Sequence, residues 1–414
     1  MILFTYFEWF MDHKKYQHIK NLSQRMTYCM LCFFLVVGCF HQSTETQKVY
    51  EEDKETTDTD TITATDSDDQ ISHGANEEDT PKIIVNNVII LGEGPFSDPE
   101  NITNVWIEGK YIREIGQDIG NEQEDASQTE QRWLVPAFID SHVHFAYLPK
   151  SEEMLRAGIC AAVDLASPES FLTVDVAPMQ MIYSGPMVTS ELGYPTQSWG
   201  SDGYGIQCAT EECVLSSIQR LHSNGVSIIK IPLVGAYLEE DLLRIAVAEA
   251  HHLGLKIVTH AMNEEVVQTA ADMDMDVLAH CPTGQLSDET IQKWSSKTLI
   301  PTISAFGGST TTIDNLRRFH ESGTTILYGT DFGNANQIGI SSTEISLMMT
   351  AGFSGTEIIN AGTYLPATYW GFEELGQIRE GYRASFLVYA ENPIQNPVIL
   401  SQPMEVWIDG QKQE

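Results

Sequence analysis

Strand-like runs alternate with helical segments along most of this chain, and this rhythm limits its fold more than any other feature. Apolar, β-branched runs recur about every 28 residues between positions 134 and 331, the length of one strand plus one helix. Eight runs are present, at 134–140, 159–166, 180–185, 226–232, 255–260, 275–280, 299–306 and 325–331. They predict an α/β fold, a (β/α)8 TIM barrel over residues 134–375.

The two ends of the expected folded region have a different character. Residues 82–91 and 104–116 are β-branched runs separated by turn residues, and residues 383–394 and 404–411 repeat this pattern. We therefore expect a small β-sandwich domain built from 82–133 and 376–414.

Ionisable side chains stand at the predicted strands. The first strand ends in Asp140-Ser141-His142-Val143-His144, the fourth carries Lys230, and the fifth, sixth and eighth end at His260, His280 and Asp331. Active sites of such barrels lie at the carboxyl ends of the strands, and residues two apart in a strand share a face. Neutral imidazole and carboxylate bind zinc and related ions, so these histidines and the aspartate predict a metal site.

Lys230 needs a separate explanation, because a protonated ammonium has no lone pair for a metal. Burial lowers the pKa of a lysine, so its amine is more often neutral. A neutral amine reacts with CO₂ to give a carbamate, whose oxygens can bridge two metals. An ion-paired interior lysine beside a single metal is the alternative, and the sequence leaves both open.

These residues resemble the metal-dependent amidohydrolase superfamily. Residues 136–144 match its strand-1 motif Pro-Gly-x-Ile-Asp-x-His-x-His, with Ala137 in place of Gly. The resemblance runs over 82–414 and is nearest to the imidazolonepropionase-like and Xaa-Pro dipeptidase-like members. Residues 365–393 resemble the C-terminal motif of these members, with Leu365 in place of Asn and Ser385 in place of Asp.

The resemblance implies two divalent metal ions, with zinc as the expected metal. His142, His144 and Asp331 would hold one ion, His260 and His280 would hold the second, and carboxylated Lys230 and a hydroxide would bridge them. Asp331 would accept the hydroxide proton and pass it to the leaving amine. The implied reaction is hydrolysis of an amide, a peptide or a cyclic C–N bond, with a small-molecule amide, peptide or lactam as substrate.

Three further features lie near these strands. Tyr237 stands where the related dipeptidases place a substrate-contacting tyrosine, although an aromatic that covers the barrel edge would look the same. Residues 192–205 form a loop rich in Gly and aromatics, which suits a pocket wall or a plain surface loop. Cys208 and Cys213 could pair in an exported protein, but short loops strain disulfides.

The N-terminus is typical of an exported protein. Residues 26–38 form a short apolar run behind four basic residues, the pattern of a secretory signal peptide. The sequence Val36-Val37-Gly38-Cys39 resembles the bacterial lipobox, which implies a signal peptide over 1–39 and lipidation of Cys39. Phe40 resembles an outer-membrane sorting residue, so we expect a lipoprotein on the periplasmic side of that membrane. A short uncleaved anchor or a buried helix is the alternative, and Met11 is a second candidate start.

Residues 40–81 should form an acidic, disordered tether. Between 41 and 80 there are thirteen acidic residues and two lysines, with few apolar side chains to bury. The whole chain has a net charge of −35, which argues against nucleic acid as a partner and against a polybasic membrane surface. Contact with a membrane is therefore expected through the lipid anchor only.

Two other functions remain open from the sequence. A single metal beside an ion-paired Lys230 would indicate a mononuclear, deaminase-like hydrolase. A site that has lost catalysis would indicate a non-catalytic, lipid-tethered binding protein. The oligomeric state and the substrate stay undetermined.

Overall fold

The computed structural model describes residues 82–119 and 130–414, which lie in one compact unit from Ala75 to Glu414. The predicted signal peptide, the lipidation site Cys39 and the tether over 40–81 fall outside the described residues. Among the helices of the described ranges, none is long and apolar enough to cross a membrane.

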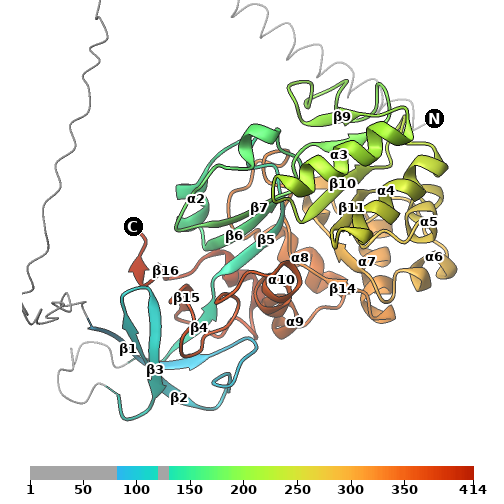
Figure 1. Cartoon of the computed structure of the whole chain (residues 1–414). Helices are drawn as coiled ribbons and strands as arrows, with labels where there is room; N and C mark the ends of the chain where they lie inside the picture. Colours follow the sequence, from blue (N-terminus) through green and yellow to red (C-terminus); the bar gives the residue numbers. More distant parts are fainter. Residues whose placement is uncertain (1–81, 120–129) are drawn as a thin grey trace, which may run out of the picture. The chain divides into compact units, whose positions relative to one another are not determined.

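One mixed sheet unites the two ends of the described chain (Figure 1). Its order is β17-β16-β15-β4-β1-β2-β3. β4 is the joining strand, because it pairs in parallel with β1 and antiparallel with β15. The bounds are β1 (Lys82–Ile90), β2 (Ile102–Glu108), β3 (Tyr111–Gly116), β4 (Arg132–Pro136), β15 (Phe386–Tyr389), β16 (Glu405–Ile408) and β17 (Gln411–Lys412). Strands from both ends do combine, but as one seven-stranded sheet, so the predicted β-sandwich is not confirmed.

The middle of the chain carries parallel strands, and each of the eight predicted runs overlaps one of them. Three form one sheet, β5 (Phe138–Val143), β6 (Ile159–Asp164) and β7 (Gln180–Tyr183). Five form another, β10 (Ile228–Pro232), β11 (Lys256–His260), β12 (Val277–Ala279), β13 (Thr298–Ile300) and β14 (Thr325–Ile326). A third, unpredicted pair is β8 (Met187–Thr189) with β9 (Gly205–Gln207).

These sheets do not join into a closed barrel within the described ranges, and that part of the prediction is corrected. β8 lies beside β10 without pairing with it, and Gly185, at a left-handed φ of 69°, interrupts the chain between β7 and β8. On the other side, the segment after β14 runs along β5. The N–H of Ser141 donates to the carbonyl of Tyr328 at 2.9 Å, and that of Asp331 to the carbonyl of His142 at 2.8 Å. The α/β class therefore holds, with an interrupted ring of strands.

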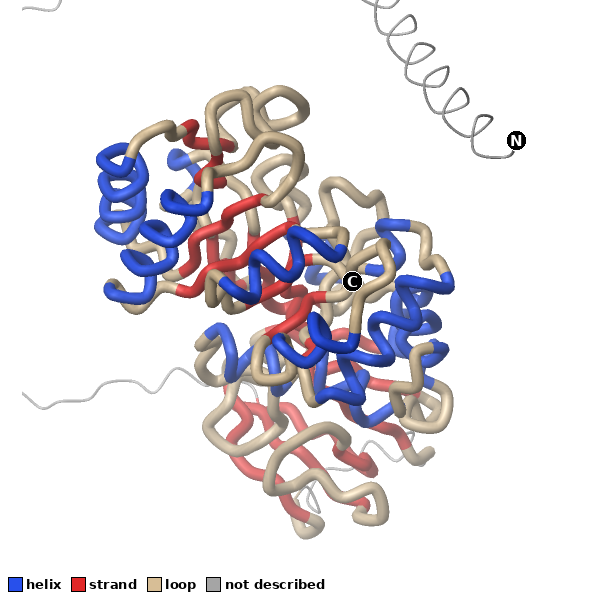
Figure 2. The backbone as a smooth tube through the Cα atoms, turned by 90° about the vertical axis from the view of Figure 1, so that its right-hand side faces the viewer, coloured by secondary structure: helices blue, strands red, loops and turns tan. Residues whose placement is uncertain are grey.

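The helices pack along the outside of the parallel strands (Figures 1 and 2). Four of these helices have an N-cap Asn or Ser whose side-chain oxygen accepts a hydrogen bond from a backbone N–H of the first turn. The caps are Asn263, Ser287, Ser309 and Ser341. Such caps stabilise a helix by about 1 kcal/mol each. The helices are α2 (Ser151–Arg156), α3 (Glu211–Ser223), α4 (Glu240–His252), α5 (Glu264–Asp272), α6 (Asp288–Lys293), α7 (Thr310–Ser322), α8 (Ser342–Thr350), α9 (Gly355–Gly362) and α10 (Tyr364–Trp370). Short 3-10 turns are η1 (Glu169–Phe171), η2 (Ile303–Phe306) and η3 (Pro397–Ser401).

A buried carboxylate fixes α8 to η2. Glu344 is fully buried, and its two oxygens accept bonds from the N–H groups of Ile303 at 2.9 Å and Ser304 at 2.8 Å. Burial raises the pKa of Glu344 to about 7, against the two hydrogen bonds that favour the ionised form.

We predict a pH-dependent contribution of Glu344 to stability. Because its folded pKa lies above the unfolded one, the stabilising effect is complete below pH 4.5 and is lost as pH rises through about 7. From pH 4 to pH 8, the free energy of unfolding of the wild type should fall by about 3 kcal/mol relative to that of E344Q. Urea unfolding at both pH values measures it, and a constant difference would refute the role of this carboxyl.

Candidate metal centre

Six ionisable side chains predicted from the sequence converge at the ends of these strands. His142 and His144 lie at the end of β5, Lys230 lies within β10, and His260, His280 and Asp331 follow or end β11, β12 and β14. Five of the six are at most 3% exposed, and His260 is half-buried.

The distances show one cluster. Asp331 Oδ1 lies 3.4 Å from Nε2 of His142 and 3.1 Å from Nε2 of His144. The ring of His280 lies 4.6 Å from that of His142 and 4.5 Å from that of His260. His142, His280 and Asp331 each offer a ligand atom within 4.8 Å of the others. That trio takes one histidine from each of the two predicted pairs.

Burial sets the protonation of this cluster. It lowers the pKa of His142 and His280 well below the usual range and that of His260 to about 3, and the charge of Lys230 lowers all three further. Burial also lowers the pKa of Lys230 to about 7, opposed by the negative charge of Asp331. These three imidazoles are thus neutral, and a sizeable fraction of the Lys230 amine is neutral near pH 7.

Several buried polar atoms of the cluster make no hydrogen bond to any residue that the structure describes. They are both ring nitrogens of His142, Nδ1 of His144, Nζ of Lys230 and Oδ1 of Asp331. Burying such an atom without a partner ordinarily destabilises the folded state by about 1–3 kcal/mol. A set of imidazole nitrogens and a carboxylate oxygen with free lone pairs fits a divalent metal of the zinc type.

Polar neighbours orient the cluster. Asp140 Oδ1 accepts bonds from the N–H groups of His142 and Thr330 at 3.1 Å each, which ties β5 to the segment before Asp331. Thr302 Oγ1 lies 2.7 Å from Nδ1 of His280, so the hydroxyl fixes this ring and leaves Nε2 for a ligand. Asp164, the last residue of β6, accepts hydrogen bonds from the N–H groups of Ala146 at 2.7 Å and Ala166 at 2.9 Å.

The sequence interpretation gave no role to these three neighbours. Asp140 ends the first predicted run and Asp164 lies near the end of the second, so the rule that found the histidines would have found them too. Thr302 lies inside the run predicted as a strand over 299–306, and the structure ends that strand, β13, at Ile300. Nothing local in the sequence singles it out.

Backbone strain accompanies the site. His280 has φ 74° and Asp331 has φ 59°, both in the left-handed region that non-glycine residues rarely adopt. Such residues cost about 1–3 kcal/mol each and persist where the surroundings hold them. The backbone next to Asp331 is also closely packed: a Cβ on Gly329 would lie 2.5 Å from Cγ2 of Ile300 and 3.1 Å from Cβ of His142.

The predicted loop over 192–205 contacts the cluster through two rings. The ring of Trp199 lies 5.0 Å from that of His144, and the ring of Tyr194 lies 5.8 Å from that of His260. Burial, together with the negative charge of Asp331, raises the pKa of Tyr194 to about 12, against the hydrogen bond from Trp199. This loop therefore lies against the candidate metal centre.

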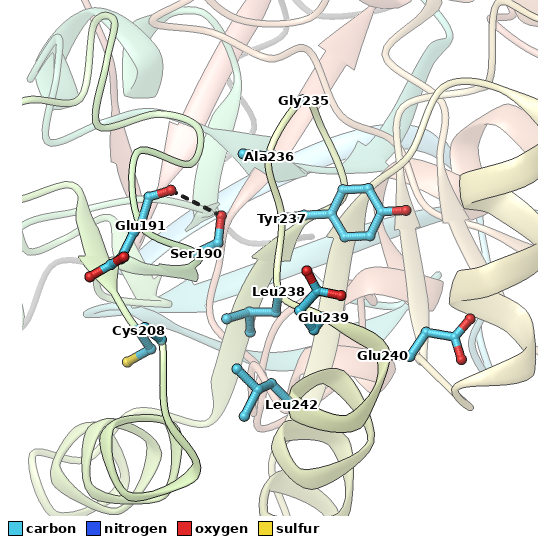
Figure 3. A pocket seen from close by; sticks show the side chains of 11 residues that line it. Ser190, Glu191, Cys208, Gly235, Ala236, Tyr237, Leu238, Glu239, Glu240 and Leu242 are labelled. Carbon is cyan, nitrogen blue, oxygen red and sulfur yellow. Dashed lines mark hydrogen bonds between the residues drawn. The ribbon is translucent and has the colours of Figure 1, made fainter.

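Tyr237 lies in a separate pocket of about 550 Å³ on the loop after β10 (Figure 3). The pocket is also lined by Glu191, Glu239 and Glu240, and by none of the six clustered residues. Cys208 forms part of its wall and is bonded to Cys213, with Cα atoms 5.4 Å apart, as in ordinary disulfides. The pairing that the spacing left open is thus present.

Comparison with known proteins agrees with this geometry. Residues 233–412 match the amidohydrolase family. This range holds His260, His280 and Asp331. Uncharacterized proteins of Mycobacterium bovis and Mycobacterium tuberculosis are 22% identical over 327 residues, which cover 67% of this chain and 84% of theirs.

Solved structures share the fold. An Xaa-Pro dipeptidase with bound methionine has a TM-score of 0.66 at 17% identity, covering 81% of this chain and 100% of that one. A putative prolidase from Bifidobacterium longum has 0.66 at 20%, covering 80% and 94%. Ochratoxinase of A. niger has 0.62 at 18%, covering 80% and 96%. These neighbours show the fold alone, and the match over 233–412 shows similarity to the amidohydrolase family.

Proposed function

We propose that this protein is a metal-dependent hydrolase that cleaves an amide, peptide or cyclic C–N bond of a small molecule. The observation that carries the proposal is the convergence of six ionisable residues, five of them buried and His260 half-buried, several of whose polar atoms lack hydrogen bonds to described residues. The amidohydrolase match over 233–412 and neighbours described as a dipeptidase, a prolidase and ochratoxinase support a hydrolase of this kind.

In this proposal the six clustered residues have different roles. His142, His144 and Asp331 would hold one ion, His260 and His280 a second, and Lys230, as a carbamate, would lie between them. Bound divalent ions would polarise the scissile carbonyl and lower the pKa of a water molecule. The lowered pKa of Lys230, about 7, supports carbamate formation, since only the neutral amine reacts with CO₂.

Asp331 is the proposed proton carrier. Its Oδ1 lies within 3.4 Å of two imidazoles and makes no hydrogen bond to described residues, so it can accept a proton from the attacking water and give it to the leaving nitrogen. Asp140 and Thr302 hold β5 and His280 in position, and the lowered pKa values of His142 and His280 keep these two rings neutral.

We predict that D331N lowers kcat by about 10²–10⁴-fold, the usual contribution of a general base, while the protein still folds and binds metal. Turnover is measured on a panel of dipeptides, N-acyl amino acids and lactams with added metal. D272N, on the exposed end of α5, is the matched control and should keep wild-type rates. Near-normal turnover by D331N would remove Asp331 from this role.

A mononuclear hydrolase of the deaminase type is the second candidate. The trio His142, His280 and Asp331, whose ligand atoms lie within 4.8 Å of one another, would suffice for a single ion. Lys230 would then act as a cation beside Asp331. Release of ammonia from an amino-substituted ring, with one metal per chain, favours this candidate over the amidohydrolase.

We also propose that the chain is exported and anchored by a lipid on Cys39. The disulfide between Cys208 and Cys213 supports export, because such bonds persist in oxidising compartments. Expressed in a Gram-negative host with radiolabelled palmitate, the wild-type chain should carry label in the membrane fraction and C39S should not. Equal labelling of both would refute the anchor.

A further inference from the structure

Four aromatic side chains form a continuous surface that begins at the candidate metal centre, the aromatic wall of Tyr147, Tyr194, Trp199 and Tyr204. The ring of Trp199 lies 5.0 Å from His144, 5.6 Å from Tyr147 and 5.4 Å from Tyr204. His144 is buried, whereas Tyr147 is 48% exposed. The wall thus leads from the buried ligands to the solvent.

The wall has its own support. Tyr194, Trp199 and Tyr204 pack with Ala146, Ala166, Met187 and Phe171 in a small apolar cluster distinct from the main core. Tyr194 and Trp199 remain half-buried, so part of each ring is accessible.

The hydroxyl of Tyr194 accepts one hydrogen bond, which leaves its own proton as a donor. The indole N–H of Trp199 donates to Tyr194 Oη at 2.8 Å. Because an indole nitrogen only donates, the phenol oxygen is the acceptor in this bond, and its own proton is left for another acceptor. The ring of Tyr194 contacts that of His260, so this hydroxyl belongs to the surroundings of the cluster.

The loop that carries the two rings is held in shape. The N–H of Leu192 donates to Gln207 Oε1 at 2.7 Å, and the hydroxyl of Thr196 donates to the carbonyl of Gly193 at 2.6 Å. A Cβ at position 193 would collide with Thr189 and lie 2.9 Å from the carbonyl of Ala236, so glycine alone allows this approach. A surface ordered before binding loses less entropy when a ligand arrives.

We infer that the aromatic wall is the specificity subsite of the proposed hydrolase. It binds an aromatic group next to the scissile amide, and Tyr194 Oη donates a hydrogen bond to a substrate oxygen. The inference rests on the proposed function for the amide, but the preference for an aromatic group follows from the rings themselves. Edge-to-face and stacked ring contacts raise affinity by about 2- to 10-fold beyond simple burial of area.

The test uses two amides that differ in aromatic content, N-benzoyl-L-phenylalanine and N-acetyl-L-alanine. Binding of each to the full chain, with and without added zinc, is measured by calorimetry, and hydrolysis is followed separately. The wild type should bind the aromatic amide at least 10-fold more tightly. W199L should remove most of this preference.

Y194F tests the hydroxyl while keeping the ring, so it remains informative if W199L does not fold. It should weaken both probes about 5- to 10-fold, the effect of one lost hydrogen bond. Y111F, which removes the hydroxyl of a tyrosine on β3, is the matched control and should bind both probes like the wild type.

The outcomes separate the two proposals. If the aromatic amide binds through Trp199 but neither probe is hydrolysed under any metal condition, the wall stands and the hydrolase proposal fails. If both probes are hydrolysed with the same selectivity in wild type and W199L, the hydrolase stands and the wall is refuted. Equal binding of both probes to the wild type also refutes the wall.

Discussion

Burial of ionisable groups without hydrogen-bond partners among the described residues is the constraint on which the candidate site depends. It keeps His142 and His280 neutral and brings the pKa of Lys230 to about 7. The same burial makes each unpaired atom costly. A fold that maintains this cluster, with two of its members in left-handed backbone conformations, must recover the free energy elsewhere. A bound cation would pair with these atoms and would offset the cost of burying them without partners.

The fold brings the cluster together through a few specific ties. Asp140 accepts hydrogen bonds from both His142 and Thr330, which are far apart in the sequence, and the chain after β14 runs along β5. Glycine at 329 allows this approach, since a side chain there would collide with Ile300. The strands need not form a closed ring for the site to assemble, because their carboxyl ends already meet where β5 and the segment after β14 lie together.

The sequence predicts the local elements and the site residues better than it predicts the connections between strands. Periodicity finds the eight predicted runs but not β8 and β9. Polar residues at strand ends indicate five of the six clustered residues, and Lys230 stands out as a charged residue inside an apolar run. Periodicity reports which positions are buried but not which strands pair, so the interruption between β8 and β10 could not be seen. The run over 134–140 divides between β4 and β5 because its first half pairs with β15 instead. The contact of Thr302 with His280 depends on the turn after β13, for which the sequence has no local signal.

The metal content of the purified chain tests the central claim most directly. Mass spectrometry of the wild type, expressed with added zinc and freed of loosely bound metal, should show two divalent ions per chain. A variant with His142 and His280 both changed to alanine should bind markedly less. One ion per chain would contradict the bridged site and leave Lys230 outside the metal centre. No bound metal, even after incubation with zinc, would contradict the whole account of this cluster.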